Sequence, residues 1–370
     1  MNEPSRDDSP SLAQLLEDLK MHEWSMNWKT ADALAEMGQD AFPHLLKFLQ
    51  SEDGYVRNGA AIALGKIGNG AAVQPLLRAL QWRDDHVSED DEDQEARSSA
   101  ATALGKLRDH SACAPLLAEL EKIRETDATL ASYIIESLGE IGNPQAIPLL
   151  ARMVEYGDGD IQKLASWALA QMGAEGVEIL LRIAPDRSRE GRQYVVRALG
   201  ASKSESAVPA LIDILKNRGD DKFVRGEAAR TLGRIGKSPD IMLVLSAILE
   251  TPEDEVRSSA LAGLGYLRDP AAYGAIIKQL EDIQLRYTAV MALGELGDSR
   301  ACELLISMLK SEDYSLRFHA TTALGKIGCS NAISALIELR DRQTDSLDLP
   351  GERVTVEATI KMLQDKKANK

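Results

Sequence analysis

Residues 53–80 read DGYVRNGAAIALGKIGNGAAVQPLLRAL, and this stretch decides the fold. In its first half, Val56, Ala60 and Leu64 recur at helical spacing and form one apolar stripe. Gly68 then predicts the end of the helix, because glycine readily adopts the left-handed conformation of a C-cap. A second apolar helical pattern follows directly. The stretch therefore predicts two helices joined by a tight turn.

The same pattern recurs along the chain, and the leucine of ALGKIG marks each copy. The marker occurs ten times at intervals of 29 to 40 residues, at Leu34, Leu64, Leu104, Leu138, Leu169, Leu199, Leu232, Leu264, Leu293 and Leu324. Each unit of such an array packs only on its neighbours, so 370 residues need no deeper core. We predict an all-α protein, a right-handed α-solenoid of about 10 to 11 helix-turn-helix repeats and about 22 helices.

The repeat resembles a known family, the HEAT-like repeats of the phycobilisome-lyase type. The resemblance is carried by EDGYVRNGAAIALGKIGNGAAVQPLL (52–77), EDEVRSSALAGLGYLRDPAAYGAI (253–276) and EDYSLRFHATTALGKIGCSNAISAL (312–336), and it extends over residues 11–340. It implies the α-solenoid fold. It implies little about function, because the same repeat serves many tasks.

An arginine precedes the marker by seven residues in most repeats. These arginines are Arg57, Arg97, Arg192, Arg225, Arg257, Arg286 and Arg317. In related repeats such an arginine pairs with an acidic residue at a neighbouring turn. The resemblance therefore implies a structural ladder of ion pairs along the stack and no catalytic role.

The domain organisation follows from the repeat and from its interruptions. We expect a disordered tail over residues 1–10, a single solenoid over 11–366 and a frayed tail over 365–370. Residues 82–95 form an insertion rich in Asp and Glu, which predicts a mobile loop whose deletion over 84–94 leaves stability unchanged. A docking site for a basic partner or a cation is the alternative for this loop. A capping helix is expected over 352–364.

Composition excludes several classes of function. The formal net charge of −15 argues against nucleic-acid binding, which depends on Lys and Arg contacts to phosphates. Cys113, Cys302 and Cys329 lie far apart and predict neither a zinc site nor a disulfide framework, which favours a reducing cytoplasm. The N-terminus has no apolar signal region and the chain no long apolar run, so we expect a cytoplasmic protein without a membrane segment.

Motifs for catalysis are not apparent in the sequence. The five histidines lie in different repeats without HxxxH or HExxH spacing. Deoxyhypusine hydroxylases, which are HEAT-repeat enzymes, bind two irons through several His-Glu dipeptides. The one such dipeptide here, His22-Glu23, lies away from the matching position. We therefore expect no catalytic residue, no metal site and no cofactor, although an enzyme remains open in the form of a bilin lyase.

Candidate binding residues follow from helix geometry. Positions −6, −2 and +2 from the marker lie opposite the apolar stripe. They place Trp167, Arg197, Arg230 and Arg234 on successive repeats, flanked by Glu136 and Tyr266, and a second patch at Tyr287, Met291 and Phe318. Trp, Tyr and Arg are enriched in binding hot spots. Two alternatives remain open: Trp167 packs against the next repeat, and the arginines pair with local acids.

The N-terminal aromatic residues Trp24 and Trp28 are expected to seal the end of the stack. The leading hypothesis for function is a non-enzymatic scaffold or adaptor that holds a protein client on the concave face. The resemblance suggests an alternative, a phycobilin lyase or chromophore-handling chaperone that acts on a phycobiliprotein. In that alternative the arginines meet the bilin propionates, Trp167 and Tyr266 contact the rings, and Glu136 holds the pyrrole nitrogens. Delivery of a metal cofactor to a client is a third possibility.

Overall fold

The protein is described here from a computed structural model, which covers residues 10–20, 24–82, 91–184, 188–236, 238–342 and 351–368. Over these residues the chain forms 22 α-helices, short 3-10 turns and no strand. The predicted all-α repeat fold is thereby confirmed. The described helices fall into two compact units, the first ending at Ile183 and the second beginning at Ala184.

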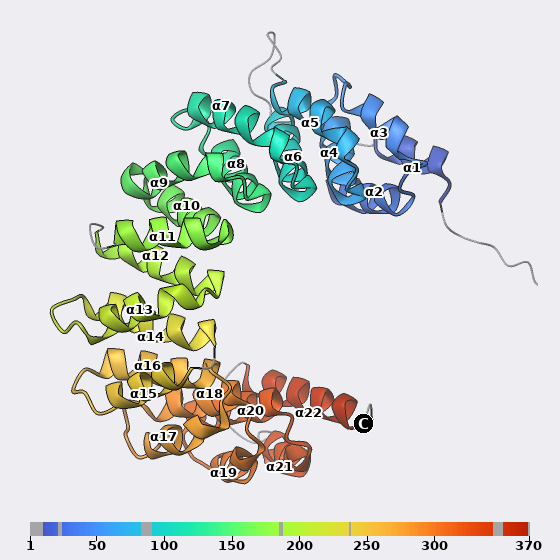
Figure 1. The fold of residues 1–370 in the computed structure, drawn as a ribbon. Helices are drawn as coiled ribbons and strands as arrows, with labels where there is room; N and C mark the ends of the chain where they lie inside the picture. The colour runs from blue at the N-terminus through green and yellow to red at the C-terminus, as the bar shows by residue number, and fades with distance from the viewer. Residues whose placement is uncertain are drawn as a thin grey trace, which may run out of the picture. The chain divides into compact units, whose positions relative to one another are not determined.

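The helices alternate between a first helix (A) and a second, marker-bearing helix (B) in each repeat. In the first unit the A helices are α1 (Leu12–Asp18), α3 (Phe42–Phe48), α5 (Val73–Leu80), α7 (Cys113–Ile123), α9 (Ile147–Tyr156) and α11 (Gly173–Ile183). The B helices are α2 (Trp24–Glu36), α4 (Gly54–Ile67), α6 (Asp91–Leu107), α8 (Ala128–Ile141) and α10 (Gly159–Gln171). Successive B helices pack on one another, and the A helices form a second layer (Figure 1).

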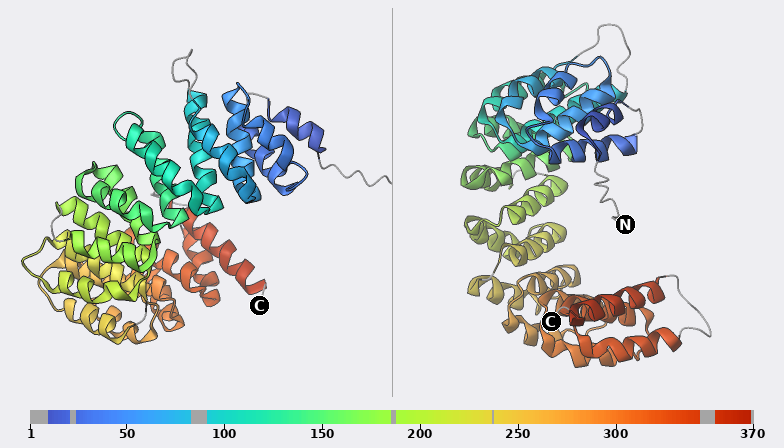
Figure 2. Two further views of the ribbon diagram at one scale, coloured as in Figure 1. Left: turned by 45° about the horizontal axis from the view of Figure 1, so that its top comes forward. Right: turned by 90° about the vertical axis from the view of Figure 1, so that its right-hand side faces the viewer.

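The second unit repeats this arrangement. Its B helices are α12 (Arg189–Ser202), α14 (Lys222–Ile235), α16 (Asp254–Tyr266), α18 (Arg286–Leu296), α20 (Tyr314–Ile327) and α22 (Glu352–Ala368). Its A helices are α13 (Val208–Lys216), α15 (Pro239–Ile248), α17 (Tyr273–Lys278), α19 (Cys302–Met308) and α21 (Ile333–Arg342). Each A helix packs on the B helix that follows it, and the B helices stack in order (Figure 2).

Local sequence explains where the helices begin and end. Helix α4 begins after Asp53, whose carboxylate accepts hydrogen bonds from the backbone N–H groups of Tyr55 and Val56. It ends at Gly68, which has φ of 73° and caps the helix as predicted. All ten marker leucines are fully buried between the layers. They form the core that the repeat pattern indicated.

The glycine directly after the marker has a different role from that of Gly68. Gly65 lies inside α4, where a Cβ atom would come within 2.9 Å of Cα and Cβ of Ala103 on α6. Adjacent B helices therefore approach to backbone contact at this position. The predicted cap at Gly68 is thus confirmed, whereas Gly65 is a packing residue.

The predicted ladder of ion pairs is confirmed for six of its seven arginines, whereas Arg286 donates to the Leu280 carbonyl. Arg225 donates from Nε to the Leu215 carbonyl at 3.1 Å and from Nη1 to the Glu253 carboxylate at 2.7 Å. It thus links the end of its own A helix to the N-cap of the next B helix. Arg317 repeats the pattern with the Ser311 carbonyl at 2.9 Å and Glu352 at 2.9 Å. These arginines neutralise helix C-termini and fix the register of neighbouring repeats.

The acidic insertion differs from the prediction of one loop over 82–95. Residues 83–90 lie outside the described residues, whereas the residues from Asp91 onward belong to α6. Asp93 forms an ion pair with the buried Arg57, and Gln94 donates to Asp127 at 3.0 Å. The expectation of a mobile loop over residues 84–94 is therefore wrong at its C-terminal end, where a ladder contact lies. The effect of deleting these residues on stability stays a prediction.

The C-terminal helix is longer than expected. Helix α22 extends to Ala368, so the predicted end at 364 and the predicted frayed tail from 365 are wrong over those residues. Met362 and Thr359 of α22 lie against Gly325 of α20, which occupies the position that Gly65 has in α4. The helix therefore packs as the B helix of an eleventh repeat and covers the last marker-bearing helix.

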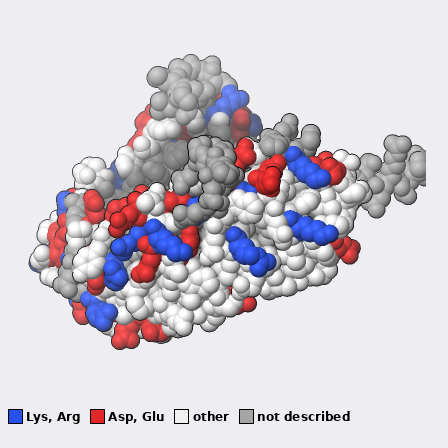
Figure 3. Space-filling view, turned by 90° about the horizontal axis from the view of Figure 1, so that it is seen from above, with Lys and Arg blue, Asp and Glu red and all other residues white. Residues whose placement is uncertain are grey.

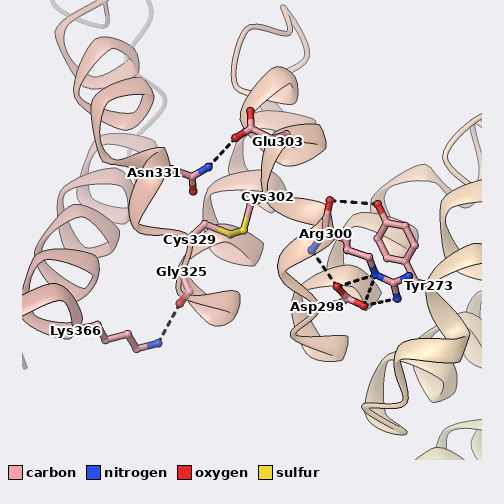
Figure 4. The surroundings of a disulfide bond; sticks show 9 residues. All are labelled: Tyr273, Asp298, Arg300, Cys302, Glu303, Gly325, Cys329, Asn331 and Lys366. Atoms are coloured by element: carbon pink, nitrogen blue, oxygen red, sulfur yellow. Dashed lines mark hydrogen bonds and ion pairs between the residues drawn. A yellow bond between two sulfur atoms is a disulfide. The ribbon is translucent and has the colours of Figure 1, made fainter. Parts of the chain in front are cut away.

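A disulfide bond in the second unit contradicts the expectation of unpaired cysteines. Cys302 and Cys329 are bonded, with Cα atoms 5.8 Å apart (Figure 4). Their separation of 27 residues is close to one repeat, so equivalent edges of neighbouring repeats bring them together. In a repeat array, cysteines that are far apart in the sequence can be neighbours in space, so their separation was the wrong criterion for excluding a disulfide. The inference of a reducing compartment loses this basis, because disulfides persist in oxidising surroundings.

Candidate functional site

Three of the predicted arginines converge on one carboxylate in the second unit. Arg197 comes from α12, and Arg230 and Arg234 come from α14. All three pair with Glu227, a buried residue of α14. We call these four residues the arginine cluster. The alternative in which the arginines pair with local acids is thus correct in part, but one acid serves three arginines.

The Glu227 carboxylate accepts hydrogen bonds from all three arginines of the cluster. Nε of Arg197 lies 3.2 Å from Oε1 of Glu227, and Nη2 of Arg230 lies 3.0 Å from Oε2. Nη1 of Arg234 lies 3.5 Å from Oε1. Burial alone raises the pKa of the Glu227 carboxyl, but hydrogen bonds and charges from Arg197 and Arg230 outweigh burial and lower it. Glu227 is therefore ionised at neutral pH.

The charges in the cluster do not cancel. Three guanidinium groups against one carboxylate leave an excess of two positive charges. The arginine side chains are 34–43% exposed, so this excess faces solvent. Two nearby acids are occupied elsewhere, since Asp254 pairs with Arg257 and Glu255 with Lys222. The cluster is a cationic site in a chain of net charge −15.

An aromatic ring and a cavity adjoin the cluster. The guanidinium of Arg234 lies 5.0 Å from the ring centre of Tyr266, the last residue of α16. Nη1 of Arg230 donates to Oγ of Ser259 at 2.6 Å. A cavity of about 510 Å³ opens beside Arg230, and its lining includes the charged residues Lys222, Asp254 and Glu255 and the polar residues Ser258 and Gln284. Hydrogen-bonding groups can therefore approach Arg230 from this side.

The second predicted patch also lies in the second unit. Tyr287 of α18 and Phe318 of α20 are half-buried, and their rings flank His319 at 5.8 and 5.6 Å between centroids. The Tyr287 hydroxyl donates to Asp313 at 2.6 Å. This hydrogen bond raises the pKa of Tyr287, whereas burial lowers that of His319. Met291, the third residue predicted for this patch, is exposed.

Two predicted residues belong to the first unit. Glu136 lies on α8, where burial of its carboxyl and the like charge of Glu140 raise its pKa. Trp167 lies on α10 and is half-buried. Neither belongs to the unit that holds the arginine cluster. The expected role of these two residues in binding stays a prediction.

Sequence reasoning missed one feature in each unit. Glu227 precedes Arg230 by three residues and Arg234 by seven, which places all three on one helix face, and this spacing could have identified it. Trp28 was expected to seal the end of the stack, but its side chain is half-exposed on the B-helix face of the first unit. Basic and acidic side chains are interspersed on the face in Figure 3, with a broad area that carries neither.

The described residues also bear on metal binding and on membrane insertion. No group of three or more His, Cys, Asp or Glu side chains that could hold a metal ion occurs among them. In the same part of the chain, no helix has both the length and the apolar character needed to cross a membrane.

This chain is similar to several curated proteins. Protein YibA of Escherichia coli K12 is 29% identical over 126 residues, which are 34% of this chain and 44% of YibA. The chain thus spans less than half the length of that relative. A deoxyhypusine hydroxylase of Neurospora crassa is 25% identical over 248 residues, covering 63% of this chain and 73% of the enzyme. A protein of Pseudanabaena tenuis, called uncharacterized phycocyanin operon protein Z, is 23% identical over 177 residues, covering 45% of this chain and 87% of that protein.

Solved structures with a similar fold include the crystal structure of Kap121p, at 16% identity and a TM-score of 0.46, covering 97% of this chain and 46% of that one. The sequence model of PBS lyase HEAT-like repeats matches residues 96–122 and 256–282. The model of HEAT repeats matches residues 9–90, 114–185, 177–265 and 270–348, which is most of the chain. The chain therefore belongs to the HEAT-repeat family.

Proposed function

We propose that this chain is a non-enzymatic scaffold or adaptor that holds a protein partner on its B-helix face, with the arginine cluster as an anchor. The observation that carries the proposal is the excess of two positive charges around Glu227. Arginine offers several N–H donors in a fixed plane and pairs well with carboxylates. The complementary partner segment is acidic, with carboxylates that reach Arg197, Arg230 and Arg234.

The folded repeat array supports a binding role in a second way. Because the helices are already folded, binding a partner costs little free energy for ordering the receptor surface. The half-buried ring of Tyr266 beside Arg234 adds apolar contact next to the charges. Trp, Tyr and Arg together are the residue types that contribute most to binding energy in interfaces.

The test compares two variants of the full chain. Proteins captured from the source cells are identified by mass spectrometry with wild type and with Arg197→Gln/Arg234→Gln, which retains the Arg230–Glu227 pair. The matched control Arg300→Gln/Arg340→Gln removes the same charge from two arginines outside the B helices. We expect Arg197→Gln/Arg234→Gln to lose one or more acidic partners that wild type and the control both capture. Such a loss corresponds to an affinity at least about thirtyfold weaker. Equal capture by all three proteins would refute the proposal.

A second candidate function is the handling of a bilin chromophore. It is favoured by the matches to PBS lyase HEAT-like repeats, one of which, residues 256–282, includes Tyr266. In this role the arginines bind the propionates and Tyr266 contacts a ring. Co-expression with bilin-producing enzymes distinguishes the two functions. A purified protein with visible absorbance that disappears in Arg197→Gln/Arg234→Gln supports bilin handling, and a colourless protein argues against it.

A further inference from the structure

A groove on the B-helix face of the first unit has no role in the site described above. Its volume is about 520 Å³. It crosses four successive B helices, and its lining includes Trp28 of α2, Asn58 and Ile62 of α4, Ser98 of α6 and Tyr133 of α8. We call it the α2–α8 groove.

The floor of the groove carries two polar groups without a protein partner. Asn58 is 5% exposed and Ser98 is 6% exposed. Neither Oδ1 of Asn58 nor Oγ of Ser98 makes a hydrogen bond to another described residue. A buried polar atom left without a partner costs about 1 to 3 kcal/mol, so native structures seldom keep one without a use. Both groups line the groove, where a ligand can reach them.

Aromatic side chains stand at both ends of the groove. The side chain of Trp28 is 47% exposed and that of Tyr133 is 40% exposed. Aromatic residues make up only 4% of the chain, and two of them are exposed along this one groove. Nζ of Lys66 lies 5.3 Å from the ring centre of Trp28 and helps to fix this ring. Ile62 supplies an apolar floor between the polar groups. A bulky apolar side chain can therefore pack against Trp28 and Ile62.

The shape and charge of the groove select the ligand. Packed helices lie about 8 to 10 Å apart, so four of them extend over about 25 to 30 Å. A volume of 520 Å³ spread over that length is a shallow trough. Lys106 and Glu95 line it with opposite charges, and the buried groups are neutral. An extended polypeptide, which rises about 3.3 Å per residue, fits a trough of this length with about eight residues.

We propose that the α2–α8 groove binds an extended, uncharged peptide segment. A backbone N–H of the segment donates to Oδ1 of Asn58, Ser98 forms a second hydrogen bond, and an apolar side chain packs against Trp28 and Ile62. The proposal deepens the scaffold function and rests on it in one respect, namely that the partner is a polypeptide. It is independent of the arginine cluster, which lies in the other unit and attracts acidic groups.

The test begins with a phage-displayed library of random linear nonapeptides selected on the immobilised full chain. Enriched peptides of zero net charge are synthesised with a fluorescein label, and their binding is measured by fluorescence anisotropy. Trp28→Ala and Asn58→Leu should each weaken binding at least tenfold. Asn58→Leu should leave the melting temperature equal or higher, because it removes a buried group without a partner. If Asn58 only stabilised the fold, Asn58→Leu would lower the melting temperature and leave peptide binding unchanged.

Matched controls separate this site from the rest of the molecule. Thr321→Val removes another buried hydroxyl without a partner, but on α20, and should leave peptide binding unchanged. Arg197→Gln/Arg234→Gln should also leave it unchanged. Enriched neutral peptides that bind Trp28→Ala and Asn58→Leu as they bind wild type would overturn the proposal, as would a selection that enriches none. If the cluster variant still loses its acidic partner in either case, the proposed function stands and only the groove assignment fails.

Discussion

At the scale of single residues, the glycine after each marker leucine sets how closely neighbouring B helices approach. We predict that Gly65→Ala destabilises the protein by about 1 to 3 kcal/mol, because the new Cβ meets Ala103 and forces the helices apart. This cost exceeds the gain of about 1 kcal/mol in helix propensity. Urea unfolding followed by circular dichroism measures it. Gly274→Ala, where a Cβ meets nothing within 4 Å, is the control and should be neutral or slightly stabilising.

A second residue-scale prediction concerns the pH dependence of the arginine cluster. The pKa of Glu227 is lowered in the folded protein, so its contribution to stability is present at neutral pH. It is lost as the pH falls below the unfolded-state value of about 4.3 and passes through the folded-state value. Glu227→Gln should therefore destabilise the protein by about 1 to 3 kcal/mol at pH 7.

The difference between wild type and Glu227→Gln in unfolding free energy should shrink as the pH is lowered from 5 to 3. The control is Glu178→Gln at an exposed position of α11, which should change stability by about 0.5 kcal/mol or less. A difference that stays constant over this pH range would show that the Glu227 carboxylate does not hold the cluster together.

At the scale of the helices, most B helices end on a glycine but three end on a residue that tolerates the cap conformation poorly. Gly68, Gly142, Gly297 and Gly328 have positive φ, and Arg108, Lys203 and Arg268 occupy the equivalent ends with φ of 50° to 52°. We predict that Arg268→Gly stabilises the protein by about 0.5 to 1 kcal/mol, because glycine carries no Cβ penalty there. Thermal unfolding by calorimetry gives the sign. A lower melting temperature would mean that the arginine side chain contributes more than the backbone strain costs.

At the scale of the whole molecule, the disulfide links two neighbouring repeats of the second unit. Cys329 occupies the turn position at which Asn69, Asp109, Asn143, Asp269 and Asp298 cap their 3-10 turns, and it makes no such cap. A loop of 27 residues closed by a disulfide contributes about 3 to 4 kcal/mol in the chain-entropy account. Reduction should therefore lower the unfolding temperature measured by calorimetry.

Two variants test the origin of this effect. Cys302→Ser/Cys329→Ser should unfold like the reduced wild type and should not respond to a reductant. Cys329→Asp should recover about 1 kcal/mol relative to reduced wild type, because it restores the cap of the turn. A melting temperature that is the same with and without reductant would show that the bond contributes nothing to the stability of the second unit.

Sequence alone determined the repeat and its core, because a fixed period of apolar and small residues can be buried in only one way when like units stack. The marker leucines, the cap at Gly68 and the ladder through Arg225 and Arg317 all follow from residue type and spacing, the last with help from the family resemblance. The presence of the arginines on the B-helix face was also predictable, since helical periodicity places them opposite the apolar stripe.

Tertiary structure alone decided which residues meet between repeats, because residues about one repeat apart become neighbours and sequence distance does not reveal this. The bond between Cys302 and Cys329, the backbone contact at Gly65 and the pairing of Arg57 with Asp93 all arise in this way. The same cause explains the functional surfaces. Arg197 reaches Glu227 from the preceding repeat. Asn58 and Ser98 lie six residues before their markers, which places them opposite the apolar stripe, but they are buried on the floor of a groove because the neighbouring B helices pack against them.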